Sequence, residues 1–250
     1  MNELQLLIDL HRSQQRQGPG SVTATKLALE LTGLNPAIPL KIADIGCGTG
    51  ASSLLLAKQL NAHITAVDFL PEFLDVLKQR ATLAGVSDRI TPLACSMDSL
   101  PFDKDVYDVI WSEGAIYNIG FENGIQLWRP FLKKHGVLVV SEITWTTNDR
   151  PAELQTYWDA QYPEINTASS KLQILENNGY SPIGYFVLAE DCWLENYYDP
   201  LVNSFPDFVA RHPQDNEALS LIEREKEEIQ FYRKYKSCYS YGVYIAKKTD

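Results

Sequence analysis

The stretch KIADIGCGTGASSLLLAKQL, Lys41 to Leu60, joins an apolar run containing an acid to three alternating glycines and a leucine-rich segment. The apolar run predicts a buried strand, and the leucine-rich segment predicts a helix. Gly46, Gly48 and Gly50 lie between them, although glycine loses more backbone entropy on folding than any other residue. A sharp turn alone needs fewer glycines, whereas a flat, extended ligand can lie against a backbone that lacks Cβ atoms. We therefore expect a ligand at this strand-to-helix turn.

Composition and charge describe an acidic globular protein. The chain has 250 residues, 45% of them hydrophobic, and a net charge of -10, which suits one domain with a sizeable core and argues against a nucleic-acid partner. The four cysteines are widely spaced and form no CxxC pair, so we expect reduced thiols, without a disulfide framework or a metal site. No apolar run has the length of a membrane span, and no segment is typical of a signal peptide. We expect a cytoplasmic protein without a membrane partner.

Strand-like and helix-like patterns alternate along the chain, which is typical of βαβ units in a parallel sheet with helices on both faces. We treat residues 1–250 as one domain, with N-terminal helices in 1–35 and lid-like insertions at 150–178 and 191–237. The charged helix at 216–235 is interpreted as a solvated face. Strands are expected at 41–45, 63–69, 90–95, 107–112, 137–143, 182–190 and 239–248.

Two ligand classes fit the glycine-rich turn, because ligands of such sheets bind at the carboxyl ends of the strands. Gly46, Gly48 and Ala51 satisfy G-x-G-x-x-A, the pattern of a dinucleotide whose pyrophosphate rests on a helix N-terminus. Asp44 would repel that pyrophosphate, whereas its carboxylate can hold an ammonium group directly or through water. The acid therefore favours S-adenosylmethionine, which carries an ammonium, over a dinucleotide.

Four segments resemble a known family. DIGCGTG at 44–50 resembles motif I of the class I S-adenosylmethionine-dependent methyltransferases. CSMDSLPF at 95–102, FLKKHGVLVVSE at 131–142 and ILENNGYSPIGYFVL at 174–188 are similar, in the same order, to segments of the ubiquinone/menaquinone-type methyltransferase domain. The resemblance implies a Rossmann-like, seven-stranded, mostly parallel sheet whose last strand is antiparallel. It also implies S-adenosyl-L-methionine as cofactor and S-adenosyl-L-homocysteine as product.

The family's motifs also imply cofactor-binding residues in this sequence. Asp68 ends the second strand and can accept hydrogen bonds from both ribose hydroxyls. Ser96 stands where the family usually has an aspartate for the adenine amino group, so adenine would depend more on the backbone at Met97 and on stacking against Phe69. His135, which replaces a family glycine, is interpreted as an exposed turn residue. The expected set in these segments is Asp44, Gly46, Cys47, Gly48, Gly50, Asp68, Phe69, Ser96 and Met97.

Further candidates lie outside these motifs, and each has a structural alternative. Glu113 follows the fourth strand, where it would hold the methionine ammonium, act as a base for the acceptor, or merely cap a helix. Tyr117 would shape the opening for methyl transfer or pack in the core. Gln17 and Gly18 would close the cofactor site or form an interhelical turn. His11 would act as a base or pack on its helix face.

These features together predict a methyltransferase that acts on a small molecule by direct in-line displacement, with neither the acceptor nor the oligomeric state specified. Two alternatives are a non-catalytic protein that binds S-adenosylmethionine and, with less support, an NAD-dependent oxidoreductase.

Aromatic residues of the late segments would either roof an acceptor pocket or form the insertion's own core. They are Trp145, Tyr157, Trp158, Tyr162, Trp193, Tyr197 and Tyr198.

Overall fold

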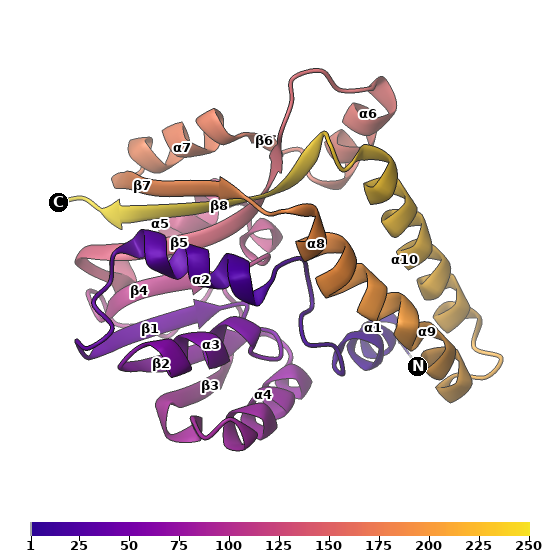
Figure 1. The fold of residues 1–250 in the computed structure, drawn as a ribbon, viewed down its shortest axis with the longest axis horizontal. Helices are drawn as coiled ribbons and strands as arrows, with labels where there is room; N and C mark the ends of the chain where they lie inside the picture. The colour runs from indigo at the N-terminus through magenta and orange to yellow at the C-terminus, as the bar shows by residue number, and fades with distance from the viewer. Residues whose placement is uncertain (1) are drawn as a thin grey trace.

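The computed structural model describes residues 2–250 and has a central mixed sheet with strand order β3-β2-β1-β4-β5-β8-β7 (Figure 1). All neighbouring strands pair in parallel except β8, which runs antiparallel to β5 and β7. The two-residue β6 adds to the edge of β5 and is too short to produce a sequence pattern. The predicted fold class is confirmed. The strands are β1 Leu40–Ile45, β2 Ala62–Asp68, β3 Ile90–Ala94, β4 Tyr107–Ser112, β5 Leu132–Trp145, β6 Asn166–Thr167, β7 Tyr180–Val187 and β8 Tyr239–Lys248.

Helices cover both faces of the sheet, and their local starts and stops follow from the sequence. Ser21 accepts a hydrogen bond from the Ala24 N–H and so caps the second helix, while Pro71 opens the fourth. The α-helices are α1 Glu3–His11, α2 Val22–Thr32, α3 Ala51–Gln59, α4 Pro71–Leu83, α5 Phe121–Trp128, α6 Ala152–Gln161, α7 Ala168–Asn177, α8 Glu190–Trp193, α9 Asp199–Arg211 and α10 Asn216–Tyr235. Short 3₁₀ turns lie at Ser87–Arg89, Ile116–Asn118 and Arg129–Phe131, and a π-helical turn at Leu194–Tyr198.

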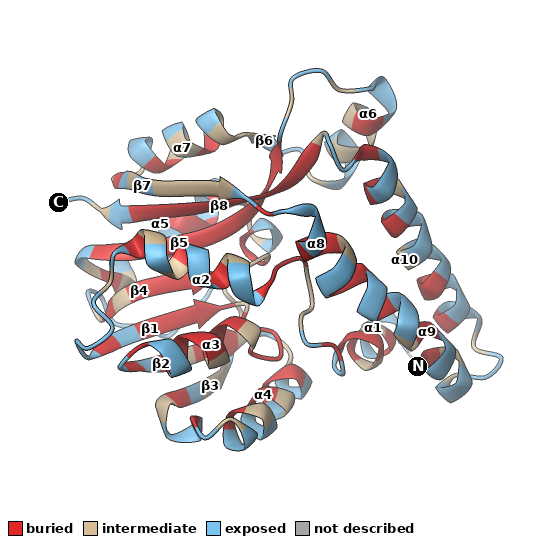
Figure 2. Ribbon diagram, viewed as in Figure 1, coloured by how far each residue is buried: buried red, intermediate tan, exposed pale blue. Residues whose placement is uncertain are grey.

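The central strands β1, β4, β5 and β8 are buried on both faces, so they read as nearly continuous apolar runs. Ile42 and Val109 belong to the core on one face, and Ala43 and Ile110 to the core on the other, because successive side chains of a strand alternate between faces. Figure 2 shows the buried residues concentrated on the central strands and on the inner sides of the helices. This burial fixes the register that brings the carboxyl ends of β1 and β4 together.

The N-terminal helix and the late insertion pack together beyond the carboxyl ends of the strands. α1, α9 and α10 lie side by side there, away from the opposite edge that carries the C-terminus (Figure 1). Leu6 and Leu10 of α1 are buried. Asp9 accepts hydrogen bonds at 2.9 Å from both Arg211 Nε and the ring of His212. The helical cover over the sheet edge is therefore assembled from both ends of the chain.

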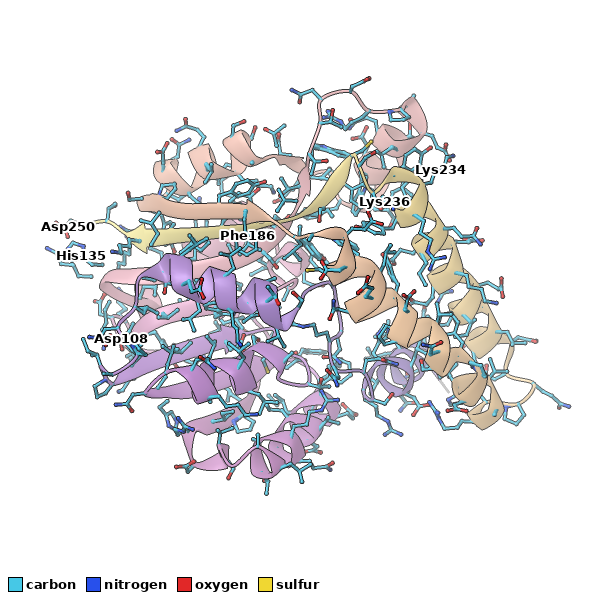
Figure 3. The ribbon with its side chains drawn as sticks, in the orientation of Figure 1. Asp108, His135, Phe186, Lys234, Lys236 and Asp250 are labelled. Atoms are coloured by element: carbon cyan, nitrogen blue, oxygen red, sulfur yellow. The ribbon has the colours of Figure 1, made fainter. Side chains whose placement is uncertain are left out.

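Two further observations bear on expectations from the sequence. His135 is exposed, with φ of 61°, near Asp250 at the edge far from α9 and α10 (Figure 3). Its exposure agrees with the expectation, but it lies within β5 and not in a turn before that strand. Among residues 2–250, no helix is both long enough and apolar enough to span a bilayer.

Candidate functional site

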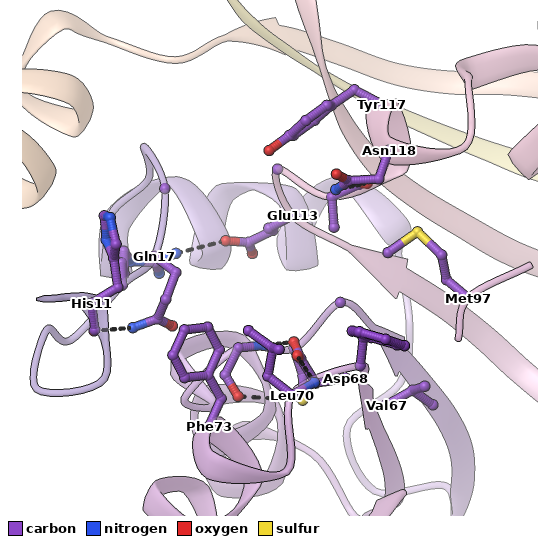
Figure 4. Close-up of a pocket in the computed structure, with 18 of the residues that line it drawn as sticks. His11, Gln17, Val67, Asp68, Leu70, Phe73, Met97, Glu113, Tyr117 and Asn118 are labelled. Carbon is purple, nitrogen blue, oxygen red and sulfur yellow. Dashed lines mark hydrogen bonds and ion pairs between the residues drawn. The ribbon is translucent and has the colours of Figure 1, made fainter. Parts of the chain in front are cut away.

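A cavity of about 700 Å³ lies at the carboxyl ends of β1, β2 and β4, beside the point where the strand order reverses (Figure 4). Its floor is the turn between β1 and α3 and the end of β2. Its walls are the loop after β4 and the linker between α1 and α2. α1, the π-helical turn and α10 close the remaining side. An open α/β sheet places its ligand in such a crevice.

Three glycines shape the turn between β1 and α3. Gly46, Gly48 and Gly50 have φ values of 74°, 54° and 92°, a left-handed conformation that favours glycine. A Cβ on each would collide with protein atoms: Ala115 Cβ at 2.3 Å, Gln17 Oε1 at 2.4 Å and Leu77 Cδ1 at 2.1 Å, respectively. The protein's own side chains therefore also occupy the space that the three Cβ atoms would fill, a packing role that the sequence alone did not reveal.

The glycine turn contributes unequally to the cavity. Gly46, Cys47 and Gly48 line it, and the N–H groups of Gly46 and Cys47 both donate to the Val67 carbonyl at 2.9 Å, which docks the turn onto β2. Gly50 precedes α3 and is not among the residues that line the cavity. The predicted cofactor contact at Gly50 lacks support, and its role in the structure is to admit a close helix contact.

Asp44 lies beneath the turn with no exposed surface. Its Oδ2 accepts hydrogen bonds from Ser52 Oγ at 2.7 Å and Ser53 Oγ at 2.5 Å, while Oδ1 is buried without a partner among residues 2–250. Burial raises the pKa of Asp44 to about 7, although the serine hydroxyls oppose that rise. Asp44 does not line the cavity, so a direct contact with a ligand's ammonium is not available. Ser52 lies between them and does line it.

Asp68 lines the cavity at the end of β2. Its Oδ2 accepts the Gly48 N–H at 2.8 Å and its Oδ1 accepts the Leu70 N–H at 2.9 Å. Burial raises the pKa of this carboxyl, and the backbone hydrogen bonds lower it. Each carboxylate oxygen has two lone pairs, so the group keeps acceptor capacity for the hydroxyls of a ligand.

An exposed ring and a backbone segment face Asp68 across one end of the cavity. Phe69 is 66% exposed and lines the cavity with Ser96 and Met97. The Met97 carbonyl accepts a hydrogen bond from Trp128 Nε1 at 2.9 Å, which fixes the backbone. Asp98 also lines this end, and hydrogen bonds from neighbouring serines lower its pKa. The sequence analysis missed Asp98, a carboxylate two residues beyond the serine that replaces the family aspartate.

The linker between α1 and α2 is tied to the glycine turn. Gln17 Oε1 accepts the Thr49 N–H at 2.8 Å, and Gln17 Nε2 donates to the His11 carbonyl at 3.1 Å and the Gln14 carbonyl at 3.2 Å. Gly18 follows, and both Gln17 and Gly18 line the cavity. The segment is therefore more than an interhelical turn: it forms a wall of the site.

Glu113 is held by side-chain donors from three segments. Arg16 Nη1 donates to Oε2 at 2.8 Å, Thr25 Oγ1 to the same oxygen at 3.1 Å, and Trp111 Nε1 to Oε1 at 2.9 Å. The carboxylate lines the cavity and none of these donors is a helix N-terminus, which argues against a cap. Because three donors fix the position of the carboxylate, Glu113 suits a fixed acceptor for a ligand. Sequence reasoning missed Arg16 because nothing local links it to a residue 97 positions away.

Among the late aromatic residues named from the sequence, Tyr197 is the one that lines the cavity in the described chain. The others pack mainly on one another: Trp193 stacks on Tyr232 with centroids 4.3 Å apart, and Trp158 meets Tyr239 at 5.1 Å. These aromatic residues therefore form chiefly the insertion's own core.

Tyr117 and the helical roof complete the cavity. Tyr117 is 40% exposed and lines it, as do His11, Glu225 and Glu228. Glu225 and Glu228 of the charged helix keep accessible surface, as a solvated face predicts, and they also line the cavity, which the sequence did not reveal. His11 is 5% exposed and packed, as the structural alternative expected, yet its ring also borders the cavity.

Comparisons with known proteins agree with this geometry. Residues 42–136 match the family model described as "Methyltransferase domain". The X-ray structure of YjhP from Escherichia coli superposes with a TM-score of 0.86 at 18% identity, covering 98% of this chain and 99% of that one. Residues 42–136 therefore match a methyltransferase domain, and the chain as a whole shares the fold of the Escherichia coli structure. The chain also shares its fold with an S-adenosylmethionine-dependent methyltransferase from Geobacter sulfurreducens, which was solved with S-adenosyl-L-homocysteine. That superposition has a TM-score of 0.82 at 19% identity and covers 98% of this chain and 97% of that one.

The curated sequence relatives align with this chain over only part of their own length. A malonyl-[acyl-carrier protein] O-methyltransferase from Herminiimonas arsenicoxydans is 36% identical over 121 residues, 48% of this chain and 44% of that protein. The chain spans 33%, 44% and 56% of the length of the first three curated relatives that it matches. The predicted resemblance to class I methyltransferases is confirmed at the level of the domain.

Proposed function

We propose that this protein is an S-adenosylmethionine-dependent methyltransferase that methylates a small-molecule acceptor by direct in-line displacement. The methyltransferase domain, its fold and the cavity at the strand ends support the proposal. The proposed cofactor site comprises the turn residues Gly46 to Gly48, Asp68 and Phe69 at the end of β2, and Ser96 and Met97 after β3. Gln17, Gly18 and Glu113 would enclose the amino-acid end.

The charge of the cavity carries this proposal. Among residues 2–250, five carboxylates line the cavity against one arginine, no lysine and the histidine His11; the arginine, Arg16, is bound to Glu113. A lining of this sign attracts a sulfonium nucleoside and repels the pyrophosphate of a dinucleotide. The carboxylates are Asp68, Asp98, Glu113, Glu225 and Glu228.

The buried acid beneath the turn also fits a cationic ligand. Asp44 Oδ1 has no partner among residues 2–250, and a buried unsatisfied oxygen calls for an explanation. A cation in the cavity would stabilise the ionised Asp44 through Ser52, since opposite charges favour the charged form. When bound, the cofactor supplies an already activated methyl group on its sulfonium.

The chain's own residues would then act by binding and orientation. Asp68 is preset by two backbone hydrogen bonds to receive ribose hydroxyls, and Glu113 is preset by three side-chain donors to receive the ammonium. Holding two reactants in line contributes on the order of 7–11 kcal/mol at most. A conspicuous catalytic triad is therefore unnecessary. Tyr117 borders the open space opposite Asp68 and is placed to shape the methyl-transfer opening (Figure 4).

Methyl-labelled S-adenosylmethionine incubated with the protein and a small-metabolite extract tests this function. The proposal expects label in a low-molecular-mass product that disappears when Asp68 is replaced by asparagine. Tight binding of the cofactor without label transfer to any acceptor would instead identify a non-catalytic binding protein. Binding of NAD without binding of S-adenosylmethionine would favour an oxidoreductase.

A further inference from the structure

The part of the cavity formed by α1, the π-helical turn, α10 and the loop after β4 is lined by two acids and three rings. Glu225 and Glu228, one helical turn apart on α10, line it together with His11, Tyr117 and Tyr197. We call these five residues the roof pocket. Figure 4 shows Tyr117 on the opposite side of the open space from Asp68, with His11 at its border.

Glu228 faces the cavity with one oxygen uncommitted. Its Oε1 accepts a hydrogen bond from the Tyr198 hydroxyl at 2.9 Å, and its Oε2 has no hydrogen-bond partner among residues 2–250. Burial raises the pKa of Glu228, and the neighbouring charge of Glu225 raises it further. The side chain nevertheless keeps accessible surface, because it borders the cavity. The nearby His11 and the Tyr198 hydrogen bond lower that pKa, but no lysine or arginine pairs with Glu228 among residues 2–250.

His11 provides an independent sign that a partner is missing. Its side chain is 7% exposed, and its Nδ1 is buried without a hydrogen-bond partner in the described chain. Its Nε2 lies 3.6 Å from Glu225 Oε1, and its ring stacks against Tyr197 with centroids 6.5 Å apart. With the ring proton on Nε2, toward the carboxylate, Nδ1 is an acceptor. The two unpaired atoms of the roof pocket, His11 Nδ1 and Glu228 Oε2, are then both hydrogen-bond acceptors, so a ligand that binds them must be a hydrogen-bond donor.

The chemistry of that donor follows from charge and shape. Arg16, which is the one lysine or arginine that lines the cavity in residues 2–250, already binds Glu113 and Thr25. No three His, Cys, Asp or Glu side chains among these residues are arranged to hold a metal ion. Aromatic faces beside carboxylates bind organic cations through cation–π attraction as well as ion pairing. A protonated amine supplies the charge and the N–H donors.

We propose that the roof pocket binds the ammonium group of a small organic amine, and therefore that the methyl acceptor is an amine. The second part rests on the proposed methyltransferase function, whereas the first does not. Glu228 would pair with the ammonium, Tyr117 and Tyr197 would flank it, and Glu225 and His11 would complete the acceptor set. For transfer, the ammonium first gives one proton to the Glu228 carboxylate. The freed nitrogen lone pair then forms a bond to the methyl carbon as the S–C bond of the sulfonium breaks, and S-adenosylhomocysteine leaves.

Calorimetric titration with a charged probe and its neutral counterpart tests the proposal. Benzylamine and benzyl alcohol have nearly the same size and differ in charge at neutral pH. Each would be titrated into protein saturated with S-adenosylhomocysteine at about 0.15 M salt, which screens long-range attraction to the acidic surface. The test variant is Glu228→Gln, which keeps an oxygen for the Tyr198 hydroxyl. Glu227→Gln, an exposed neighbour on α10 outside the cavity lining, changes net charge equally.

We expect benzylamine to bind wild type at least about tenfold more tightly than benzyl alcohol, and Glu228→Gln to lose about tenfold or more in amine affinity. Glu227→Gln should match wild type, and all three proteins should bind S-adenosylhomocysteine alike. Equal binding of amine and alcohol, no amine binding, or equal losses in both variants would overturn the proposal. If S-adenosylhomocysteine fails to bind while amine selectivity persists, the ammonium site stands and the proposed methyl transfer falls.

Discussion

Replacing Asp44 with asparagine tests how the buried charge of this acid affects the stability of the protein. The carboxyl is fully buried with one unpartnered oxygen, and its pKa rises from 3.8 to about 7 on folding. A raised pKa means that the folded state binds the proton more tightly than the unfolded chain does. The associated stability is complete below pH 3.8 and is lost as the pH rises through about 7.

The size of the Asp44 pKa shift sets the size of the expected change in the free energy of unfolding. About three pKa units correspond to a cost on the order of 4 kcal/mol when Asp44 is fully ionised above pH 7. Asparagine keeps an oxygen for Ser52 and Ser53 and carries no charge. We therefore expect Asp44→Asn to exceed wild type in free energy of unfolding at pH 8 by up to about 4 kcal/mol. The advantage should shrink by about 2–3 kcal/mol at pH 5.

Urea unfolding followed by tryptophan fluorescence at pH 5 and pH 8 measures this difference. Asp75→Asn serves as the control, because Asp75 is 66% exposed in its pair with Lys78 and its replacement should change stability by less than about 1 kcal/mol. S-adenosylhomocysteine should raise the stability of wild type more than that of Asp44→Asn, since its ammonium favours the ionised acid. An Asp44→Asn protein less stable than wild type at pH 8, or an offset independent of pH, would refute the reasoning.

Three further substitutions probe other parts of the structure. Asp68→Asn should weaken S-adenosylhomocysteine binding by about tenfold or more in calorimetry, with Asp75→Asn unchanged; equal affinities would place the ribose elsewhere. Gly50→Ala should lower the free energy of unfolding by about 1–3 kcal/mol, because the φ angle of residue 50 is 92° and the new Cβ would lie 2.1 Å from Leu77 Cδ1. A variant as stable as wild type would contradict this packing. Lys171→Met should cost about 3–5 kcal/mol by leaving the buried Glu142 unpaired, and adding Glu142→Gln should restore part of it; no restoration would argue against the pair.

Much of the fold follows from local pattern. The apolar runs around Ile42 and Val109 predict strands because both faces of the sheet are covered, and Ser21 and Pro71 mark helix starts through their own backbone chemistry. The turn at Gly48, which lines the cavity, can also be predicted from neighbouring residues alone. Such features need only neighbouring residues, so a single sequence suffices to predict them.

The contacts that complete the site depend on distant parts of the chain. Arg16 reaches Glu113 across 97 positions, and Gly50 is required by a leucine of the following βα unit. Glu228 looks like part of a solvated helix in sequence, because its direction is set by how α10 packs on α1. The burial of Asp44 likewise follows from the packing of α3 over the sheet, which no local pattern reports.

The central claim is that the cavity takes a sulfonium nucleoside in preference to a dinucleotide. Isothermal titration calorimetry of the purified protein with S-adenosylmethionine, S-adenosylhomocysteine and NAD, each titrated separately, tests it most directly. The account predicts saturable binding of both nucleosides and no binding heat with NAD. Saturable binding of NAD, with neither nucleoside bound, would contradict it.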